Sequence, residues 1–421
     1  MAQKFLVKGG NPLKGQVQIS GYKNSAGAIL AAALLSEKPS IISNLPQVSD
    51  VLNQIEIMSQ IGGEIEWIDD HTVKVNAKNL DPQKIPANIF QKMRVSVLLI
   101  GPLLARFRSF RVPHPGGDKI GLRPISTHLD AFEQFGIKIW RENGFYCFEA
   151  PKDLKPAHII LKEFSVTATE NAMMLAAGIE GKSVIEIAAA EPQVQDLIMM
   201  LENMGAKIVW THPHTLEIQG TKNLSGANHE ICPDPLETGT FMIALAITGG
   251  QGKITHTNPR HLTFFLEKMK EIGVNFNLGE NSITVNPSAD FKAARVQVML
   301  YPGFPTDLQP QISVLLTQAA GKTLIHEPLY ENRLRHFEEL RKMGADIEIT
   351  DPHRALIFGK TELFGTTVDA SDIRSGTALT LAALIAQGQT IVENIANLER
   401  GSEKFDEKLR SLGADIEKIG E

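Results

Sequence analysis

A short segment containing one glycine recurs six times along the chain and fixes the size of its building block. Two of the copies are Leu201–Trp210 (LENMGAKIVW) and Leu340–Ile349 (LRKMGADIEI). The shared glycines lie 68 to 74 residues apart, at Gly62, Gly136, Gly205, Gly273, Gly344 and Gly413. Six units account for the whole 421-residue chain, and the period is too long for the common short solenoid repeats.

Each copy predicts the end of an amphipathic helix, because glycine is favoured just after a helix, where φ is positive. A β-type run follows each glycine. Earlier in each unit we expect an Ala/Leu-rich helix, at residues 25–35, 94–105, 167–178, 238–248, 308–320 and 374–387. A further strand follows each of these helices, as at 40–43, 183–186 and 390–393. We interpret the unit as β-α-β-α-β-β, which predicts an α/β fold of six repeats (α+β in some schemes).

The tryptophans divide the six units into two groups of three. Trp67, Trp140 and Trp210 follow the repeat glycine in the first three units, and the last three units contain no tryptophan. We interpret them as packing aromatics at equivalent positions. The sequence Cys232–Pro235 (CPDP) is a natural border, because two prolines interrupt regular structure. The predicted domains are residues 22–231, and residues 1–21 together with 232–421.

The composition argues against several classes of protein. The chain has 42 Lys and Arg against 48 Asp and Glu, a net charge of −6, which disfavours a general nucleic-acid binder. The longest apolar run, Ala26–Leu35, is too short to span a membrane, and we expect no secretory signal. Cys147 and Cys232 are the only cysteines, which indicates a reducing cytoplasm and excludes a thiolate zinc cluster. The histidines are dispersed, so we expect neither a metal nor a cofactor.

Two segments have the composition of ligand-binding loops. Ser20–Ser25 (SGYKNS) precedes a predicted helix, and the helix N-terminus together with Lys23 favours an anion. A simple cap beside a solvated lysine is the alternative. Pro113–Pro124 (PHPGGDKIGLRP) predicts a loop with a mobile Gly-Gly tip. Its charged residues suit closure over a substrate, although a surface turn also fits; they are Asp118, Lys119 and Arg123.

Further charged residues lie at predicted helix starts and turns. Asp307, within Pro302–Gln311, suits either an N-terminal role in its helix or a general base. Four arginines could converge on one anionic ligand, since guanidinium groups bind carboxylates and phosphates with two hydrogen bonds. Each of them alone is typical of a surface residue; they are Arg94, Arg333, Arg374 and Arg400.

These segments, in this order, resemble the enolpyruvyl transferase family over about Phe5 to Lys418. The most specific matches are SGYKN at Ser20–Asn24, PGGDKIGLRP at Pro115–Pro124, PDPLETGTF at Pro233–Phe241, FPTDLQ at Phe304–Gln309 and ENR at Glu331–Arg333. The resemblance implies a two-domain inside-out α/β barrel, with three β-α-β-α-β-β repeats in each domain. It also implies an active site in the cleft between the domains.

The resemblance is strongest to the branch of the family that uses a sugar nucleotide. It implies that phosphoenolpyruvate donates its enolpyruvyl group to the 3′-hydroxyl of UDP-N-acetylglucosamine and releases phosphate. This is the first committed step of peptidoglycan precursor synthesis. The implied partners are therefore two small molecules, with no nucleic acid and no membrane.

The resemblance also assigns roles to residues. Three residues would be catalytic: Asp118, Asp307 and Lys23. Asp118 would protonate the methylene carbon of phosphoenolpyruvate, and Asp307 would take the proton of the sugar hydroxyl. Phosphoenolpyruvate would bind to Lys23, Asn24, Arg123, Arg333, Arg374 and Arg400. UDP-N-acetylglucosamine would bind to Arg94, Arg123, Pro124, Ile125, Ser126, Thr127, Glu163, Phe164, Ser165, Val166, Asp307 and Leu329.

Three residues depart from the pattern of the family. Asp118 stands where most members have cysteine. It can donate a proton only in its protonated form, and it cannot form the thioether adduct that cysteine makes with fosfomycin, so we predict fosfomycin resistance. Glu163 stands where lysine is usual, and Ser126 where an aspartate usually faces the uracil.

Three other functions stay open at this point. 5-Enolpyruvylshikimate-3-phosphate synthase shares the fold and the donor, but Ser20–Ala26 lacks the Lys-Ser pair and the arginine expected there. A diverged paralogue that uses another nucleotide sugar fits Glu163 and Ser126. A ligand-binding protein without activity would keep the scaffold but would show no turnover.

Overall fold

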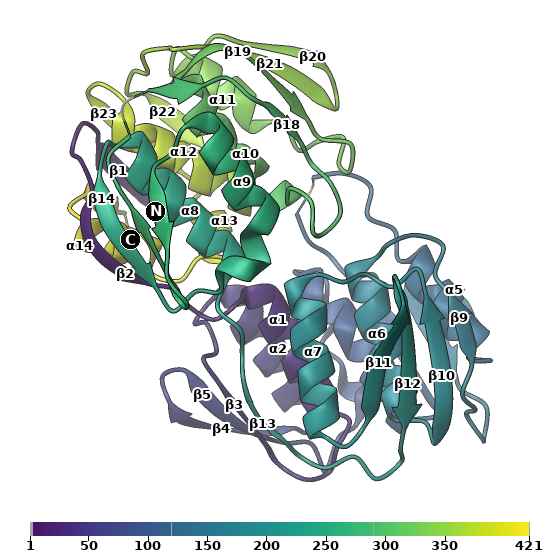
Figure 1. Cartoon of the computed structure of the whole chain (residues 1–421). Coiled ribbons are helices and arrows are strands. Elements are labelled where there is room, and N and C mark those ends of the chain that lie inside the picture. The colour runs from purple at the N-terminus through teal and green to yellow at the C-terminus, as the bar shows by residue number, and fades with distance from the viewer. Residues whose placement is uncertain (1–2, 119, 289, 421) are drawn as a thin grey trace. The chain divides into compact units, whose positions relative to one another are not determined.

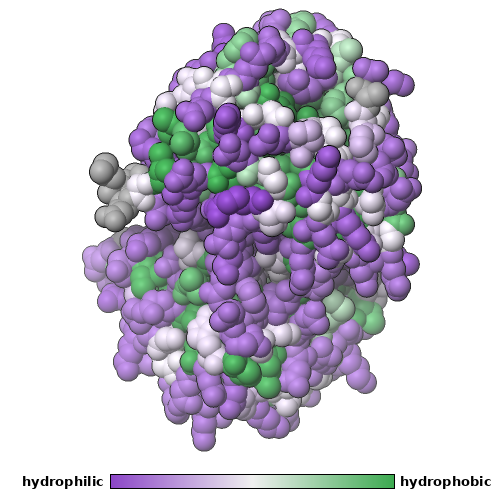
Figure 2. Space-filling view, turned by 90° about the vertical axis from the view of Figure 1, so that its left-hand side faces the viewer, coloured by the Kyte–Doolittle hydropathy of each residue, from purple (hydrophilic) through white to green (hydrophobic). Residues whose placement is uncertain are grey.

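The computed structural model describes residues 3–118, 120–288 and 290–420, which form two compact units (Figure 1). The described part of the first unit consists of residues 3–20, 120–122, 233–288 and 290–420. The second consists of Gly21–Asp118 and Arg123–Cys232. Among all the described residues, no helix is both long enough and apolar enough to cross a membrane. Figure 2 shows one face of the surface, on which hydrophilic residues predominate and apolar residues form small separate patches.

Buried helices form the centre of the second unit. They are α1 (Lys23–Ala33), the 3₁₀ helix η2 (Val95–Leu99) with α4 (Ile100–Arg106), and α6 (Val166–Ala177). Small residues let these helices pack closely. A Cβ at Gly27 would lie 2.2 Å from Val95 Cγ2, and one at Gly101 would lie 2.5 Å from the Asn171 carbonyl oxygen. A helix that is apolar on all sides is stable only when it is enclosed, which explains the central position.

Three sheets and three outer helices surround this centre. The sheets have the strand orders β13-β3-β5-β4, β6-β8-β7 and β11-β12-β10-β9. Figure 1 shows the central helices between the first and the third of these sheets. The outer helices are α2 (Ser49–Gln60), α5 (Ser126–Gln134) and α7 (Pro192–Asn203). The strands are β3 (Ser40–Ser43), β4 (Glu64–Asp69), β5 (Thr72–Asn76), β6 (Ser109–Pro113), β7 (Lys138–Glu142), β8 (Phe145–Glu149), β9 (His158–Ile160), β10 (Gly181–Glu186), β11 (Lys207–His212), β12 (Thr215–Gly220) and β13 (Asn228–Glu230).

The first unit repeats this plan. Its central helices are α8 (Pro235–Ile247), α10 (Gln309–Thr317) and α12 (Ile373–Ile385). Its outer helices are α9 (Thr263–Ile272), α11 (His336–Lys342) and α14 (Phe405–Ser411). Short helices η3 (Pro259–Leu262), η4 (Thr306–Leu308) and α13 (Ala396–Glu399) complete the helical part.

The sheets of the first unit bring both ends of the described chain together. Strand β1 (Lys4–Lys8) pairs antiparallel with β23 (Gln389–Glu393) and with β24 (Asp415–Ile419), in the order β22-β23-β1-β24. The other sheets have the orders β15-β16-β14-β2 and β17-β19-β21-β20, with β18 beside β19. Their strands, with β22, are β2 (Lys14–Gln18), β14 (Gln251–Thr255), β15 (Phe276–Leu278), β16 (Ser282–Val285), β17 (Phe291–Lys292), β18 (Arg295–Gln297), β19 (Ala319–His326), β20 (Ile347–Asp351), β21 (Arg354–Gly359) and β22 (Thr367–Asp369).

The repeat predicted from the glycine spacing is confirmed, with one irregular copy. All six repeat glycines have φ between 83° and 113°, as expected for residues that end helices. In the second repeat, the described residues before β6 form short helices, η1 (Pro82–Lys84) and α3 (Ala87–Phe90), instead of a first strand. The helix predicted at 94–105 is tightened into 3₁₀ geometry over its first half. Pro102 explains this, because it offers no N–H to the carbonyl four residues before it.

The interpretation of the tryptophans as packing aromatics is wrong for two of them, which are exposed. Trp67 and Trp140 are 40% and 39% exposed, on β4 and β7, which are edge strands of their sheets. Trp210 lies on the edge strand β11, where its indole N–H donates to Gln195 Oε1 (3.4 Å). The equivalence of the three positions follows from the repeat. Their exposure follows from the outward face of an edge strand, which the sequence spacing did not reveal.

A buried acid in α6 gives a prediction about stability. Burial raises the pKa of Glu170 well above its usual value, and the charge of Glu191 raises it further. Glu170 Oε1 has no hydrogen-bond partner among the described residues. In the folded state this carboxyl holds its proton to higher pH than in the unfolded state. Its stabilising contribution is therefore complete below the unfolded pKa and is lost as pH rises through the folded value.

Glu170→Gln should therefore stabilise the protein increasingly with pH. We expect melting temperatures equal to wild type near pH 4.5, and higher by on the order of 1–3 °C at pH 8, a shift of the size that about 1 kcal/mol produces in a large domain. Thermal unfolding across this pH range measures the difference. A variant less stable than wild type at pH 8 would show that the ionised carboxylate is stabilising.

Candidate active site

Lys23, predicted as an anion-binding residue, lies at the start of α1, where it is largely buried and forms an ion pair. Lys23 Nζ donates to Asp50 Oδ2 at 2.9 Å, and the two side chains are only 14% and 7% exposed. Asn24 Nδ2 donates to the hydroxyl of Tyr22 (3.1 Å). The alternative of a solvated lysine is therefore wrong. A cation at a helix N-terminus is a suitable group for binding an anionic ligand.

Ser20 does not cap α1. Its backbone N–H donates to Glu237 Oε2 (2.7 Å) and its hydroxyl donates to Glu403 Oε2 (2.8 Å), both in the first unit. Lys408 Nζ donates to the same hydroxyl (2.7 Å) and to Glu237 Oε1 (2.6 Å). The residue at the N-cap of α1 is Tyr22, whose side chain makes no capping bond. The alternative of a simple cap is therefore wrong for Ser20, which belongs to the other unit.

Arg94 organises the segment that precedes α5. Its guanidinium donates to the carbonyl oxygens of Arg123 (2.5 Å) and Pro124 (2.8 Å). Ile125 is buried beneath this turn, and α5 begins at Ser126. The structure thus brings Arg94 and the 123–127 segment together, although they are about 30 residues apart in the chain.

The loop before α6 joins the same region. The hydroxyl of Thr127 donates to Glu163 Oε1 (2.8 Å), and Ser165 caps α6, which begins at Val166. The ring of Phe164 is 39% exposed and contacts His214 edge-on at 4.7 Å between centroids. Predicted residues from two separate repeats therefore lie side by side in the second unit.

A buried histidine lies behind this region. His128 Nε2 is 2.8 Å from the hydroxyl of Thr167. Burial, and secondly the charge of Arg94, lower the pKa of His128 to about 3. It is therefore neutral at physiological pH and supplies no charge to a ligand.

The two glycines of the proline-rich loop are required for close packing. A Cβ at Gly116 would lie 1.9 Å from the Gln91 carbonyl oxygen. Gly117 has φ 121°, and a Cβ there would lie 2.9 Å from Arg94 Cβ. Asp118, which follows, is half-buried. Lys119 lies outside the described residues. The glycines therefore bring the backbone before Asp118 against residues 91–94.

Residues 120–122 of the loop belong to the first unit and bond to Glu331 and Asn332 there. The N–H of Leu122 donates to Glu331 Oε1 (2.8 Å), and the N–H of Asn332 donates to the carbonyl of Ile120 (3.0 Å). A Cβ at Gly121 would lie 2.5 Å from Glu331 Oε2. Glu331 belongs to a motif found in the sequence, but its role as a loop anchor was not predicted.

Gly116→Ala should displace the loop and lower turnover at least tenfold, since the added methyl group meets backbone that cannot move away cheaply. Gly144→Ala is a suitable control. It lies in a β-hairpin turn at φ 82° with open space around it, so it should cost about 1 kcal/mol of stability without changing turnover. Steady-state kinetics and thermal unfolding of both variants test this. Equal turnover in both would show that the position of the loop does not matter.

In the first unit, one carboxylate lies between two predicted arginines. Asp307, in η4, accepts hydrogen bonds from Arg333 Nη2 (2.5 Å, to Oδ1) and from Arg374 Nη2 (2.9 Å, to Oδ2). The side chains of Arg333 and Arg374 are 2% and 8% exposed, whereas Asp307 is 28% exposed. The sequence-predicted convergence of arginines therefore occurs here for two of the four. An anionic ligand would compete with Asp307 for these guanidinium groups.

Two aspartates near this cluster were not predicted from the sequence. Asp372 caps α12 through the N–H groups of Arg374 and Ser375, and it lies 3.8 Å from Arg333. Asp234 caps α8. Burial raises the pKa of Asp234 to about 7, against the opposing charge of Arg374. The Ser-Asp and Asp-Pro pairs before these helices are typical N-cap patterns and could have identified both.

The remaining predicted residues of the first unit are Leu329 and Arg400. Leu329 is 39% exposed, and its N–H donates to Glu327 Oε1 (3.0 Å). Glu327 is fully buried and accepts a hydrogen bond from the Thr306 hydroxyl (2.6 Å). Burial raises the pKa of Glu327. Arg400 is half-buried at the end of α13.

His336, three residues after Arg333, is a second fully buried histidine. Burial lowers the pKa of His336 to about 4, so this histidine is neutral at physiological pH. Its Nδ1 lies 3.2 Å from the Arg333 carbonyl oxygen. The ring is fully buried and its Nε2 has no hydrogen-bond partner among the described residues, which is typical of a packing residue.

Candidate residues in both units gather at the N-terminal ends of central helices. Lys23 starts α1, Arg94 precedes η2, Ser165 caps α6, Asp307 precedes α10 and Arg374 lies in the first turn of α12. These ends carry partial positive charge, which suits anionic substrates.

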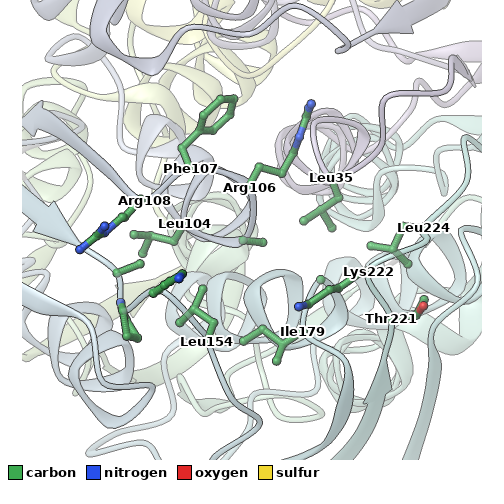
Figure 3. Close-up of a pocket in the computed structure, with 15 residues that line it drawn as sticks. Leu35, Leu104, Arg106, Phe107, Arg108, Leu154, Ile179, Thr221, Lys222 and Leu224 are labelled. Carbon is green, nitrogen blue, oxygen red and sulfur yellow. The ribbon is translucent and has the colours of Figure 1, made fainter.

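A hollow of about 400 Å³ lies at the other ends of the central helices of the second unit (Figure 3). Leu35, Leu104 and Ile179 line it with apolar surface, and Arg106 and Lys222 lie at its edge. None of the predicted site residues lines this hollow. The described residues contain no group of three or more His, Cys, Asp or Glu arranged to hold a metal.

Residues 7–409 match the sequence profile of the family described as EPSP synthase (3-phosphoshikimate 1-carboxyvinyltransferase). The chain belongs to the enolpyruvyl transferase family. Proteins named UDP-N-acetylglucosamine 1-carboxyvinyltransferase are similar to it over almost their whole length. The one from Koribacter versatilis is 42% identical over 99% of this chain and 97% of its own. Those from Halothermothrix orenii (43%) and Helicobacter pylori (42%) match over 99% of both chains.

Solved structures of enolpyruvyl transferases have the same fold. The enolpyruvyl transferase NikO from Streptomyces tendae is 25% identical, covers 99% of both chains and gives a TM-score of 0.90. EPSP synthase from Acinetobacter baumannii, at 18% identity and full coverage of both chains, gives 0.77 and supports the fold alone. The predicted family, the predicted two-domain inside-out α/β barrel and the predicted enzyme class are confirmed.

Proposed function

We propose that this enolpyruvyl transferase transfers the enolpyruvyl group of phosphoenolpyruvate to the 3′-hydroxyl of UDP-N-acetylglucosamine and releases phosphate. The observation that carries the proposal is 42% identity over 99% of the chain with a protein named for this reaction. The 18% identity to EPSP synthase gives less support to shikimate 3-phosphate as the acceptor.

We assign separate tasks to the two units. The second unit, with Arg94, the 123–127 segment and Glu163–Val166, would bind the sugar nucleotide and carry both ends of the 113–124 loop, whose described residues 120–122 belong to the first unit. The first unit, with Asp307, Leu329 and the buried arginines, would be the catalytic domain. Phosphoenolpyruvate would bind to a set of cationic and amide groups, which are Lys23, Asn24, Arg123, Arg333, Arg374 and Arg400.

The chemistry assigned to these residues consists of addition followed by elimination. Asp118 donates a proton to the methylene carbon of phosphoenolpyruvate, while the 3′-oxygen of the sugar forms a bond to the adjacent carbon. Asp307 accepts the proton from the 3′-hydroxyl as that bond forms. The tetrahedral intermediate then returns a proton from its methyl group to the Asp118 carboxylate and releases phosphate, which restores the double bond and the protonated Asp118. The cationic groups stabilise the charge on the phosphate and the carboxylate.

The proposed reaction places the enzyme in peptidoglycan synthesis. It supports the further proposal of a cytoplasmic protein that works in cell wall biogenesis and so affects cell shape and division. It requires two small-molecule substrates and no cofactor. With Asp118 in the loop, we also propose that the enzyme resists fosfomycin.

A second candidate acceptor is a different nucleotide sugar. The carboxylate of Glu163 is held by Thr127 at the start of α5, within the segment assigned to the nucleotide. A negative charge there disfavours a nearby diphosphate. This observation favours an acceptor whose phosphates lie elsewhere.

Phosphate release from phosphoenolpyruvate tests both candidates. We expect release that requires UDP-N-acetylglucosamine and does not occur with shikimate 3-phosphate. Other UDP-sugars are run in parallel, and a higher kcat/KM with one of them would support the second candidate. An absence of release with all acceptors would contradict the proposed function.

A further inference from the structure

A buried carboxylate in α7 holds three segments of the second unit together. Asp196 is 1% exposed. It accepts hydrogen bonds from the hydroxyl of Ser25, from His229 Nε2 (2.9 Å) and from the N–H of Cys232 (3.1 Å). The three donors come from α1, β13 and the chain after β13. Burying a carboxylate is costly unless it is hydrogen-bonded, so these three donors stabilise Asp196 in the interior.

Two of these donors lie beside residues assigned to phosphoenolpyruvate. Ser25 is in the first turn of α1, directly after Lys23 and Asn24. Cys232 is the last residue of the second unit before the chain leaves it, and its carbonyl accepts the N–H of Tyr22 (2.8 Å). The start of α1 is therefore fixed on one side by the Cys232 carbonyl and on the other by the Asp196 carboxylate.

The first turn of α1 lacks the usual side-chain cap, which makes this support more important. Tyr22 at the N-cap position makes no side-chain capping bond. Asp196 contacts the turn instead through the side chain of its third residue. It also adds negative charge near the helix N-terminus, where negative charge is favourable.

We propose that Asp196 is a positioning residue for phosphoenolpyruvate, which rests on the proposed function. By binding Ser25 and Cys232 together, it fixes the direction in which α1 presents Lys23 and Asn24. Asp196 itself contacts no substrate. Its loss should weaken the binding of phosphoenolpyruvate while the binding of the sugar nucleotide, assigned to other segments, is unchanged.

The test compares Ser25→Ala and Asp196→Asn with Ser36→Ala. Ser36 is a matched control, because it is also a buried serine that donates one hydrogen bond, to the Leu224 carbonyl (2.9 Å), but it lies beyond the opposite end of α1. The readouts are KM for each substrate, and hydrogen exchange of the amides of residues 22–26. Exchange does not depend on activity, so it tests the positioning even if the proposed function fails.

We expect Ser25→Ala and Asp196→Asn to raise KM for phosphoenolpyruvate at least fivefold, with KM for UDP-N-acetylglucosamine within twofold of wild type. Amide exchange at residues 22–26 should become faster in both. Ser36→Ala should lose about as much thermal stability as Ser25→Ala and change neither readout. If the ratio of the two KM values and the exchange at 22–26 match those of Ser36→Ala, Asp196 is only a stabilising residue and the proposal is overturned.

Discussion

Asp118→Asn should lower turnover at least 100-fold, the lower end of what a general acid contributes. Asparagine has nearly the same shape as aspartate and keeps the loop packing that Gly116 and Gly117 allow. It cannot, however, donate a proton to the methylene carbon. The measurement is phosphate release from phosphoenolpyruvate in the presence of UDP-N-acetylglucosamine. A fully active Asn variant would refute the role of Asp118 as the acid.

The matching gain-of-function variant is Asp118→Cys. A thiol at this position is able to donate a proton and, as a thiolate, to attack an epoxide. We expect this variant to keep turnover within tenfold of wild type and to become inactivated by fosfomycin in a time-dependent way, with one adduct per chain detectable by mass. The wild-type enzyme is the control and should stay active. Stoichiometric inactivation of the wild type would contradict the predicted resistance.

The fold was predictable because its signals are local and repeated six times. A glycine after a helix, an Ala/Leu-rich helix and a β-branched run are each a weak indication, but the same order at a constant period leaves few alternatives. The exceptions have one local and one non-local cause. Pro102 tightens one central helix, and the tryptophans on edge strands face outward because edge position depends on strand order, which the spacing of residues does not contain.

The candidate site was predictable in its residue types and not in its pairings. Lys23 and Asp307 were found from their place at helix starts. The partners Asp50 and Arg374 lie 27 and 67 residues away from them, and only the packing of helices brings those side chains into contact. Asp196 escaped prediction for a related reason. It lies inside a helix with no cap or loop nearby, so nothing local distinguishes it from a solvated acid.

Asp307→Asn should reduce turnover about 1,000-fold, because the base assigned to the 3′-hydroxyl is lost. It should also destabilise the fold. Arg333 is 2% exposed, and without the charge of Asp307 its nearest remaining carboxylate contact is Asp372 at 3.8 Å. Removing one partner of a fully buried pair costs roughly 3–5 kcal/mol, and we expect about 2 kcal/mol here because water reaches Asp307.

The two effects are separable by removing the other partner as well. In Asp307→Asn/Arg333→Met the buried guanidinium at position 333 is gone and only Arg374 has lost the charge of Asp307, so part of the lost stability should return while the enzyme stays inactive. Denaturant unfolding measures the stability and phosphate release measures the activity. If Asp307→Asn is as stable as wild type, the buried charge of Arg333 is compensated by other groups. If it keeps more than a tenth of wild-type turnover, Asp307 is not the base, and the ion pair serves only to hold the two arginines in place for the anionic donor.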